Sequence, residues 1–126
     1  MSKWEKLQVE RIIPENPKVV VFRLSGALTS TRESYDLLEQ VKDDTGSNYP
    51  QVVINLEQVT RITSAGVGIL CACFTSILRS DGRFCLVGVS DRNRILMEIV
   101  GLWSKIDHFE TEADVRFDRS LSRGVG

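Results

Sequence analysis

Three segments rich in β-branched and other apolar residues constrain the fold of this chain more than any other feature. They read KVVVFRLSG at 18–26, QVVINL at 51–56 and RFCLVGV at 83–89. A short, continuously apolar run is typical of a strand that is buried on both faces of a sheet. A stretch with helical signals follows each of them, and strands that alternate with helices form parallel sheets with right-handed crossovers. The pattern therefore predicts an α/β fold.

The remaining elements complete a β-β-α-β-α-β-α-β-α order. KLQVERI at 6–12 alternates apolar and polar residues, which predicts a half-buried strand. PENP at 14–17 predicts a turn, so this strand is expected to run antiparallel to the next one. The other expected elements are helices within 27–44, at 65–79, from Ser90 or Asp91 to Gly101 and at 110–121, and a short strand at 105–109.

The expected helices carry start signals and apolar stripes. Thr29, Ser30 or Thr31 is expected to cap the first helix, and Glu33 stands at the capping-box distance from Ser30. Helical spacing predicts the inward-facing side chains. These are Tyr35, Leu38 and Val41 in the first helix and Ile95, Leu96, Ile99 and Val100 in the third.

These elements predict one α/β domain that covers residues 1–126, a length that suits a single core. We expect a mixed, mostly parallel sheet of four to five strands, with about four helices mainly on one face. Residues 119–126 are expected to form a frayed tail, within which Ser120 and Ser122 are flanked by arginines.

Charge and hydropathy exclude several classes of partner. The chain has 16 Lys and Arg residues and 17 Asp and Glu residues, so the net charge of −1 gives no general attraction to nucleic acid or to an anionic membrane. The apolar runs are too short to span a bilayer, and the charged start MSKWEKLQVE does not resemble a signal peptide. A cytoplasmic protein without direct membrane insertion is expected.

The cysteines and the single histidine do not predict a metal site or a disulfide framework. Cys71 and Cys73 lie two residues apart in a helical pattern and point to different faces, and Cys85 lies in a strand. With His108 as the one histidine, no zinc ligand set is formed. We expect the cysteines to pack in the core, and neither a metal nor a cofactor to be bound.

The segment VTRITSAGVGIL at 59–70 carries the clearest functional signal. We expect the preceding strand to end near Leu56, with a bend and then a helix that begins near Ser64 or Ala65. Ser64 then lies at the positive end of a helix, which favours an anion, either bound or created by phosphorylation. Gly66 and Gly68 would allow another backbone to approach. The alternative is that Ser64 simply caps the helix and that the glycines allow close packing of the helix on the sheet.

The same segment does not match the motifs of nucleotide-binding proteins or hydrolases. SAGVG is neither G-x-x-x-x-G-K-[ST] nor G-x-G-x-x-G. It is not G-x-S-x-G either, because Ile62 stands at the first glycine position, and His108 would be the one histidine base. We therefore expect a binding protein rather than an enzyme.

The stretch VVINLEQVTRITSAGVGIL resembles the signature of STAS domains of the anti-sigma-factor antagonist type. Asn55-Leu56, Val59 and Gly66-Val67-Gly68 match that signature, and Ser64 stands at the position of the phosphorylated serine. LSGALTS (24–30) and RFCLVGVSDRNRILMEIVGLWSKIDHF (83–109) resemble further segments of the family. Thr29 and Thr63 stand where the family usually has aspartates, and Ala65 replaces a second serine.

This resemblance implies a protein-binding switch in transcription regulation. The unphosphorylated antagonist sequesters an anti-sigma factor that is also a serine kinase of the histidine-kinase-like ATPase type, and a serine phosphatase reverses the modification. The resemblance implies Ser64 as the phosphoacceptor, with Thr63 as the alternative. It also implies a partner-binding surface around Ser64. We include Arg92 in this surface because it follows the loop after the fourth strand. This surface comprises Thr29, Ser30, Thr63, Ser64, Ala65, Gly66 and Arg92.

A second interpretation stays open, since STAS domains that are never phosphorylated also exist. These act as adaptors or scaffolds in signalling complexes, or as subunits of transporters. Weak homodimerisation is left open as well.

Overall fold

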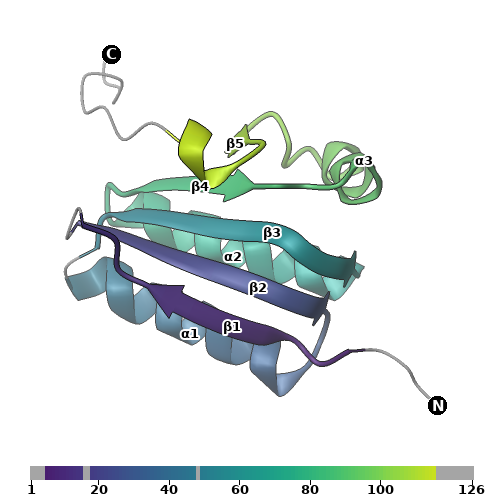
Figure 1. Cartoon of the computed structure of the whole chain (residues 1–126), viewed down its shortest axis with the longest axis horizontal. Coiled ribbons are helices and arrows are strands. Elements are labelled where there is room, and N and C mark those ends of the chain that lie inside the picture. Colours follow the sequence, from purple (N-terminus) through teal and green to yellow (C-terminus); the bar gives the residue numbers. More distant parts are fainter. Residues whose placement is uncertain (1–4, 16–17, 48, 116–126) are drawn as a thin grey trace.

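The computed structural model describes residues 5–15, 18–47 and 49–115, which form one five-stranded sheet with three α-helices and one 3-10 turn. The sheet order is β1-β2-β3-β4-β5; β1 runs antiparallel to β2, and the other neighbouring strands are parallel (Figure 1). The predicted α/β class and mixed, mostly parallel sheet are confirmed. The elements are β1 (Gln8–Ile12), β2 (Val19–Leu28), α1 (Arg32–Ser47), β3 (Gln51–Ile62), α2 (Ser64–Arg79), β4 (Arg83–Val87), α3 (Asp91–Ile99), β5 (Asp107–Phe109) and η1 (Glu112–Asp114).

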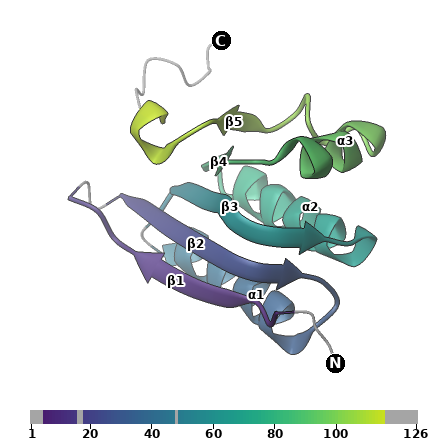
Figure 2. The same cartoon turned by 45° about the vertical axis from the view of Figure 1, so that its right-hand side comes forward.

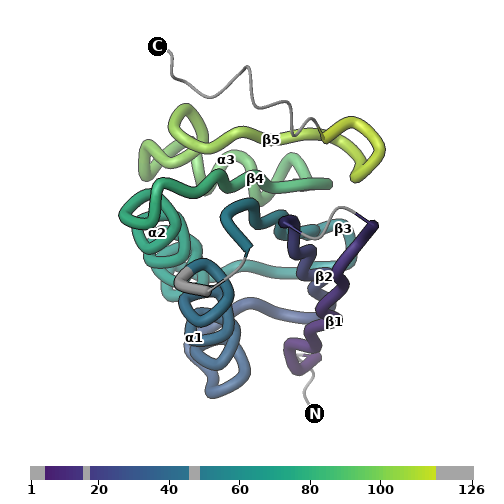
Figure 3. The backbone as a smooth tube through the Cα atoms, turned by 90° about the vertical axis from the view of Figure 1, so that its left-hand side faces the viewer, coloured from purple at the N-terminus to yellow at the C-terminus, as the bar shows by residue number. Residues whose placement is uncertain are grey.

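The helices α1 and α2 lie side by side on one face of the sheet (Figure 3). β1 and β5 form its opposite edges (Figure 2). Most buried apolar side chains lie between the sheet and these two helices, in one continuous core. A smaller cluster around Val21, Val53 and Cys85 lies on the other face.

The described part of the chain contains three α-helices rather than the predicted four. Of the helix predicted at 110–121, only Glu112–Asp114 is helical within the described residues, as the 3-10 turn η1. Residues 116–121 of that segment, the predicted tail at 119–126, and Ser120 and Ser122 lie outside the described residues. No helix in the described part is long and apolar enough to cross a membrane.

β3 is longer than predicted, and this positions the candidate site. The strand does not end near Leu56, because its ladder with β2 continues until Leu28 pairs with Ile62. Two irregularities between the paired strands place extra residues on β3. Periodicity alone missed this continuation because bulges break the alternation of buried and exposed residues. As a result, β2 and β3 end side by side, and the predicted bend before α2 is absent.

The inward face of α1 differs in part from the predicted stripe. Leu37 and Val41 are buried and Leu38 is half-buried, whereas Tyr35 is 51% exposed. The helix begins at Arg32, and Thr31 Oγ1 lies 3.4 Å from the Ser34 amide that donates to it. The alternative start at Ser30, with Glu33 in a capping box, is therefore wrong.

The predicted orientation of α3 is wrong for most of its apolar residues. Ile95, Ile99 and Val100 are exposed, with Ile99 at 75%, whereas Asn93 and Met97 are buried. Only one narrow face of this nine-residue helix contacts the body of the protein, so spacing alone assigned too many residues to the core. Ser90 caps the helix, as one of the two predicted alternatives.

The predicted packing of the cysteines is confirmed for two of the three. Cys73 and Cys85 are buried, and Cys71 is partly buried. Burial raises the pKa of the Cys73 and Cys85 thiols to about 12. These two side chains therefore stay protonated and act as small apolar groups in the core.

Candidate functional site

The site is built at the first turn of α2. Thr63 is the N-cap: its Oγ1 accepts a hydrogen bond from the Gly66 amide at 3.3 Å, and its carbonyl accepts one from the Val67 amide at 2.9 Å. The cap is therefore Thr63 and not Ser64, which is the first residue inside the helix. A threonine in extended conformation before a helix is well suited to this role.

Ser64 is exposed at the positive end of α2. Within the described residues, its hydroxyl makes no hydrogen bond, and the amides of Ser64 and Ala65 have no acceptor. A helix start with unpaired amides and an accessible hydroxyl can take a negatively charged group on that oxygen without disturbing the core.

Gly66 fixes the start of α2 against the end of β2. A Cβ atom at this position would overlap the Leu28 carbonyl oxygen, and the same carbonyl accepts a hydrogen bond from the Thr63 amide at 3.1 Å. This contact agrees with the alternative role of close helix–sheet packing for Gly66. That role is wrong for Gly68, since a Cβ there would have no other group within 4 Å.

Thr29 and Thr63 come together because they follow the paired ends of β2 and β3. Both line a pocket of about 380 Å³ beside Ser64, which Leu7, Ala27, Thr31, Glu5 and Lys6 complete. Ser30 is exposed in the bend before α1, and Ala65 is half-buried in the first turn of α2. These are positions that the family resemblance implied as parts of one surface, and the structure places them around the ends of β2 and β3 and the start of α2.

Arg92 lies on a different element from the other candidate residues. It is exposed in the first turn of α3, and within the described residues no hydrogen bond or ion pair joins it to Thr63 or Ser64. α3 and the start of α2 do lie toward the same end of the sheet (Figure 1). The structure therefore places Arg92 on a neighbouring element, not within the cluster around Ser64.

Sequence reasoning missed the residues that hold the Thr29 segment in place. Ser34 is fully buried; its Oγ accepts a hydrogen bond from the Thr29 amide at 3.2 Å and lies 3.1 Å from Thr31 Oγ1. The spacing T-x-x-S at a helix start was the available signal.

A second missed feature is a polar network on the open face of the sheet. Arg23 donates to both Glu112 carboxylate oxygens, at 2.8 and 2.9 Å, and Asn55 Nδ2 donates to one of them at 2.6 Å. These contacts fasten η1 over β2 and β3. Arg23 and Glu112 lie 89 residues apart, and no local pattern predicts such a pairing.

In the part of the chain that the structure describes, no cluster of His, Cys, Asp and Glu could hold a metal ion. Beside Ser64 the pocket offers threonine hydroxyls, apolar groups and the charged residues Glu5 and Lys6. This arrangement suits recognition and modification by another protein.

Comparison with known proteins agrees with this geometry. The family model described as STAS domain matches residues 10–115, so the chain belongs to the STAS domain family. No curated protein sequence matches the chain.

Several solved structures share the fold. The Bacillus anti-sigma factor antagonist SpoIIAA in its unphosphorylated form is 21% identical, with a TM-score of 0.71 over 86% of this chain and 91% of SpoIIAA. SpoIIAA in its phosphorylated form gives 22% identity and a TM-score of 0.60, over 86% of this chain and 95% of that one.

Two further structures represent different uses of the fold. An anti-sigma factor antagonist from Mycobacterium paratuberculosis is 21% identical, with a TM-score of 0.69 over 85% of this chain and 90% of that one. A sulfate transporter family protein from Wolinella succinogenes is 16% identical, with a TM-score of 0.64 over 81% of this chain and 83% of that one. At these identities the likeness is one of fold.

Proposed function

We propose that this protein is an anti-sigma-factor antagonist that binds its anti-sigma factor when Ser64 is unmodified and releases it when Ser64 is phosphorylated. The observation that carries the proposal is the exposed Ser64 hydroxyl on the first residue of α2. Gly66 and Thr63 fix this helix start against β2, so a partner meets the hydroxyl in one defined position.

The geometry also favours Ser64 over Thr63 as the phosphoacceptor. Thr63 Oγ1 already accepts the Gly66 amide, so modification there would remove the helix cap. A phosphate on Ser64 adds about −1.5 to −2 charge beside unpaired amides, where the helix tolerates it. The same charge would repel an acidic or closely packed partner surface.

The comparisons support the same class of function. The chain belongs to the STAS domain family, and two of the similar structures are of anti-sigma factor antagonists. One of them, SpoIIAA, has been solved in both an unphosphorylated and a phosphorylated form. We accordingly propose a serine kinase of the histidine-kinase-like ATPase type as the anti-sigma factor partner, and a serine phosphatase as its counterpart.

The proposal treats residues 1–126 as one binding unit that acts in the cytoplasm. Its partner surface comprises Ser64, the neighbouring Thr29, Ser30, Thr63, Ala65 and Gly66, and Arg92 on α3. The chemistry of the site supports a binding role, and the kinase supplies the catalysis.

An adaptor that is never phosphorylated is the second candidate function. The observation that favours it is that Thr29 and Thr63, which replace the aspartates of the family signature, leave no carboxylate at these two positions of the pocket beside Ser64. The fold likeness to a sulfate transporter family protein is consistent with this alternative.

A kinase reaction with mapping of the modified residue separates the two functions. The anti-sigma factor recovered with the unmodified chain from its native organism is incubated with ATP and the wild-type, Ser64→Ala or Thr63→Ala chain. We expect one phosphate on Ser64, none on the Ser64→Ala chain, and continued modification of the Thr63→Ala chain. Stable binding of the partner without any phosphate on residue 63 or 64 would favour the adaptor.

A further inference from the structure

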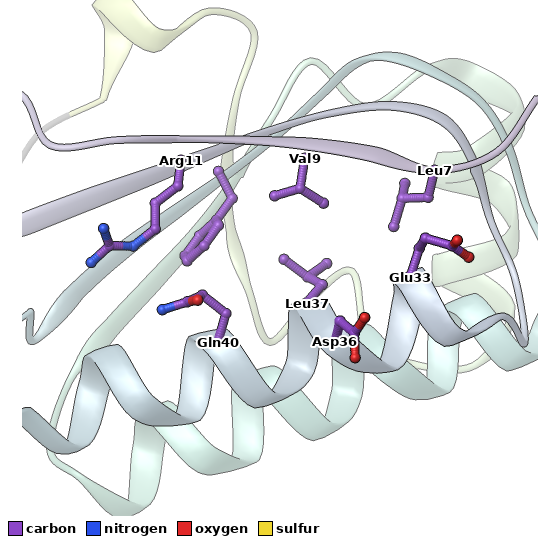
Figure 4. A pocket seen from close by; sticks show the side chains of 8 residues that line it. Leu7, Val9, Arg11, Glu33, Asp36, Leu37 and Gln40 are labelled. Atoms are coloured by element: carbon purple, nitrogen blue, oxygen red, sulfur yellow. The ribbon is translucent and has the colours of Figure 1, made fainter.

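A groove between β1 and α1 has no role in the proposed switch. It has a volume of about 340 Å³ and lies under the edge strand, along the flank of α1 (Figure 4). Its lining residues are Leu7, Val9, Arg11, Phe22, Glu33, Asp36, Leu37 and Gln40.

The groove exists because α1 packs chiefly against α2 and β3, not against the edge strand. At each end of the groove an ion pair connects α1 to β1 or to the residues just before β1. Arg11 binds Asp44 with two hydrogen bonds of 2.8 and 2.9 Å, and Lys6 lies 3.6 Å from Glu33. The space between these pairs stays open to the outside.

The floor of the groove is apolar. Leu7, Phe22 and Leu37 are buried beneath it, and Figure 4 shows Leu7 and Val9 pointing from the strand toward Leu37 on the helix. Val9 remains 40% exposed, although it faces the helix side of the sheet. An aliphatic side chain that entered here would cover Val9 and gain the free energy of apolar burial.

The charge on the rim is negative. Arg11 is neutralised by the buried Asp44, and the pair of Lys6 with Glu33 is exposed and therefore weak. Asp36 is exposed and has no hydrogen bond or ion pair within the described residues. α1 as a whole carries five acidic and two basic side chains. An occupant with a basic group complements this rim.

The outer edge of β1 supplies a second, independent attraction. Among the described residues, β1 is the terminal strand of the sheet and pairs with β2 alone, so its other edge offers backbone amides and carbonyls. A strand added there would lie about 4.8 Å from β1, with alternate side chains about 6.6 Å apart on the groove side.

We propose that the groove and the edge of β1 together bind an extended segment of a partner protein by strand addition. On the groove side, two residues apart, the segment carries an aliphatic residue that covers Val9 and a lysine or arginine that pairs with Asp36. Ser64 does not line the groove, although Leu7 lines both the groove and the pocket beside Ser64. We expect the groove to bind its segment whether or not the switch is phosphorylated.

The test uses the full chain and the fluorescent peptide Thr-Val-Thr-Lys-Thr-Val-Thr-Lys, with Glu in place of Lys as the control peptide. Fluorescence anisotropy should give saturable binding of the lysine peptide below about 1 mM, and at least about tenfold weaker binding of the glutamate peptide. Amide NMR shifts should change at Leu7–Arg11. No binding of the lysine peptide, or shifts confined to other strands, would overturn the proposal.

Two charge-reversal variants of α1 test whether Asp36 is the carboxylate that binds the lysine. Asp36→Lys should weaken binding of the lysine peptide by about tenfold or more, whereas Glu39→Lys should change the affinity for this peptide by less than about twofold. Glu39 is an exposed carboxylate of the same helix that does not line the groove. Equal effects of the two variants would show a general charge effect and refute the site. Ser64→Asp should leave peptide binding unchanged.

Backbone methylation tests strand addition itself. The amides of alternate residues in a strand point to the same edge, so a peptide N-methylated at its threonines and one N-methylated at its valines and lysines block opposite edges. One of them should lose binding and the other should keep it. Loss in both or in neither would contradict pairing with β1. Self-association of the chain through β1, detected by sedimentation and abolished by Asp36→Lys, would assign the edge to a second copy and overturn the proposal.

Discussion

Two adjacent hydroxyl residues at the start of α2 have different tasks. Thr63 Oγ1 accepts the Gly66 amide and completes the helix, whereas the Ser64 hydroxyl is exposed and available to a modifying enzyme. The two roles differ because of position. The residue before the helix can accept a hydrogen bond from a free amide of the first turn, whereas the side chain of the next residue does not reach these amides.

This difference predicts the stability of two alanine variants. Thr63→Ala should lower the free energy of unfolding by about 1 kcal/mol, because the helix loses its cap. Ser64→Ala should change it by less than about 0.5 kcal/mol, since the hydroxyl has no partner within the described residues. Urea unfolding followed by circular dichroism measures both. A larger loss for Ser64→Ala would show that its hydroxyl is structural.

Gly66 and Gly68 form a second matched pair. Gly66→Ala places a Cβ against the Leu28 carbonyl oxygen, so the backbone must move, at a cost of about 1–3 kcal/mol. Gly68→Ala meets nothing within 4 Å and should stabilise the helix by up to about 1 kcal/mol. Thermal unfolding of both variants measures the difference. Equal effects would mean that α2 does not press against the end of β2.

At the scale of elements, ion pairs at the two ends of the groove connect the β1 segment to α1, and they differ in burial. The Asp44 side chain is 7% exposed, whereas the side chains of Lys6 and Glu33 are 78% and 35% exposed. Arg11→Met would leave the Asp44 charge buried without its main partner and should cost about 3 kcal/mol or more. Lys6→Met should cost less than about 1 kcal/mol. Chemical unfolding distinguishes the two; similar values would place both pairs at the surface.

The attachment of η1 to the sheet gives stability a dependence on pH. The hydrogen bond from Arg23 lowers the pKa of Glu112 below its ordinary value of 4.5. Burial opposes this in part, and the Asn55 hydrogen bond adds to the lowering. Because the pKa of Glu112 is lower in the folded state than in the unfolded state, its charge stabilises the fold at pH values above the unfolded-state pKa. This stabilisation is lost as the pH falls through the folded-state pKa.

Glu112→Gln tests this attachment. The variant should unfold at a lower temperature than the wild type at pH 7, and the difference should shrink as the pH falls below about 4.5. Melting curves at several pH values measure it, and Glu110→Gln, at an exposed acidic position before η1, serves as the control. A difference that stays constant with pH would contradict the role of the Glu112 charge.

The sequence predicted most of these elements because their patterns are local. The apolar runs in β2, β3 and β4 predict strands without further information, and SDG at 80–82 predicts the end of α2. It did not predict the length of β3, because bulges interrupt its alternation. It also misassigned α3, since spacing shows which residues share a face but not whether another element covers that face.

At the scale of the whole molecule, the candidate residues were predicted from the family resemblance, and the parallel strands β2 and β3 explain why two of them lie close together. Their carboxyl ends meet at one edge, so Thr29 and Thr63 become neighbours although 34 positions separate them. The pocket that these threonines share with Thr31 could not be predicted, because it depends on how the segment before β1 packs beside them. The groove under β1 likewise depends on where α1 packs.

The two surfaces of the molecule are therefore expected to act independently. In the two proposals, the Ser64 end is the switch, and the edge of β1 is a constant docking site for an extended segment. Charge reversal at Asp36 should leave modification of Ser64 by the kinase intact, and phosphorylation should leave binding at the groove intact.

The measurement that tests the central claim most directly is calorimetric titration of the anti-sigma factor with a chain that carries phosphoserine at position 64. The control chain carries phosphoserine at Ser80, an exposed residue at the other end of α2. We predict that phosphate at Ser64 weakens binding by about a hundredfold or more, whereas phosphate at Ser80 changes it by less than about threefold. Equal affinity of the unmodified chain and the chain phosphorylated at Ser64 would contradict the account.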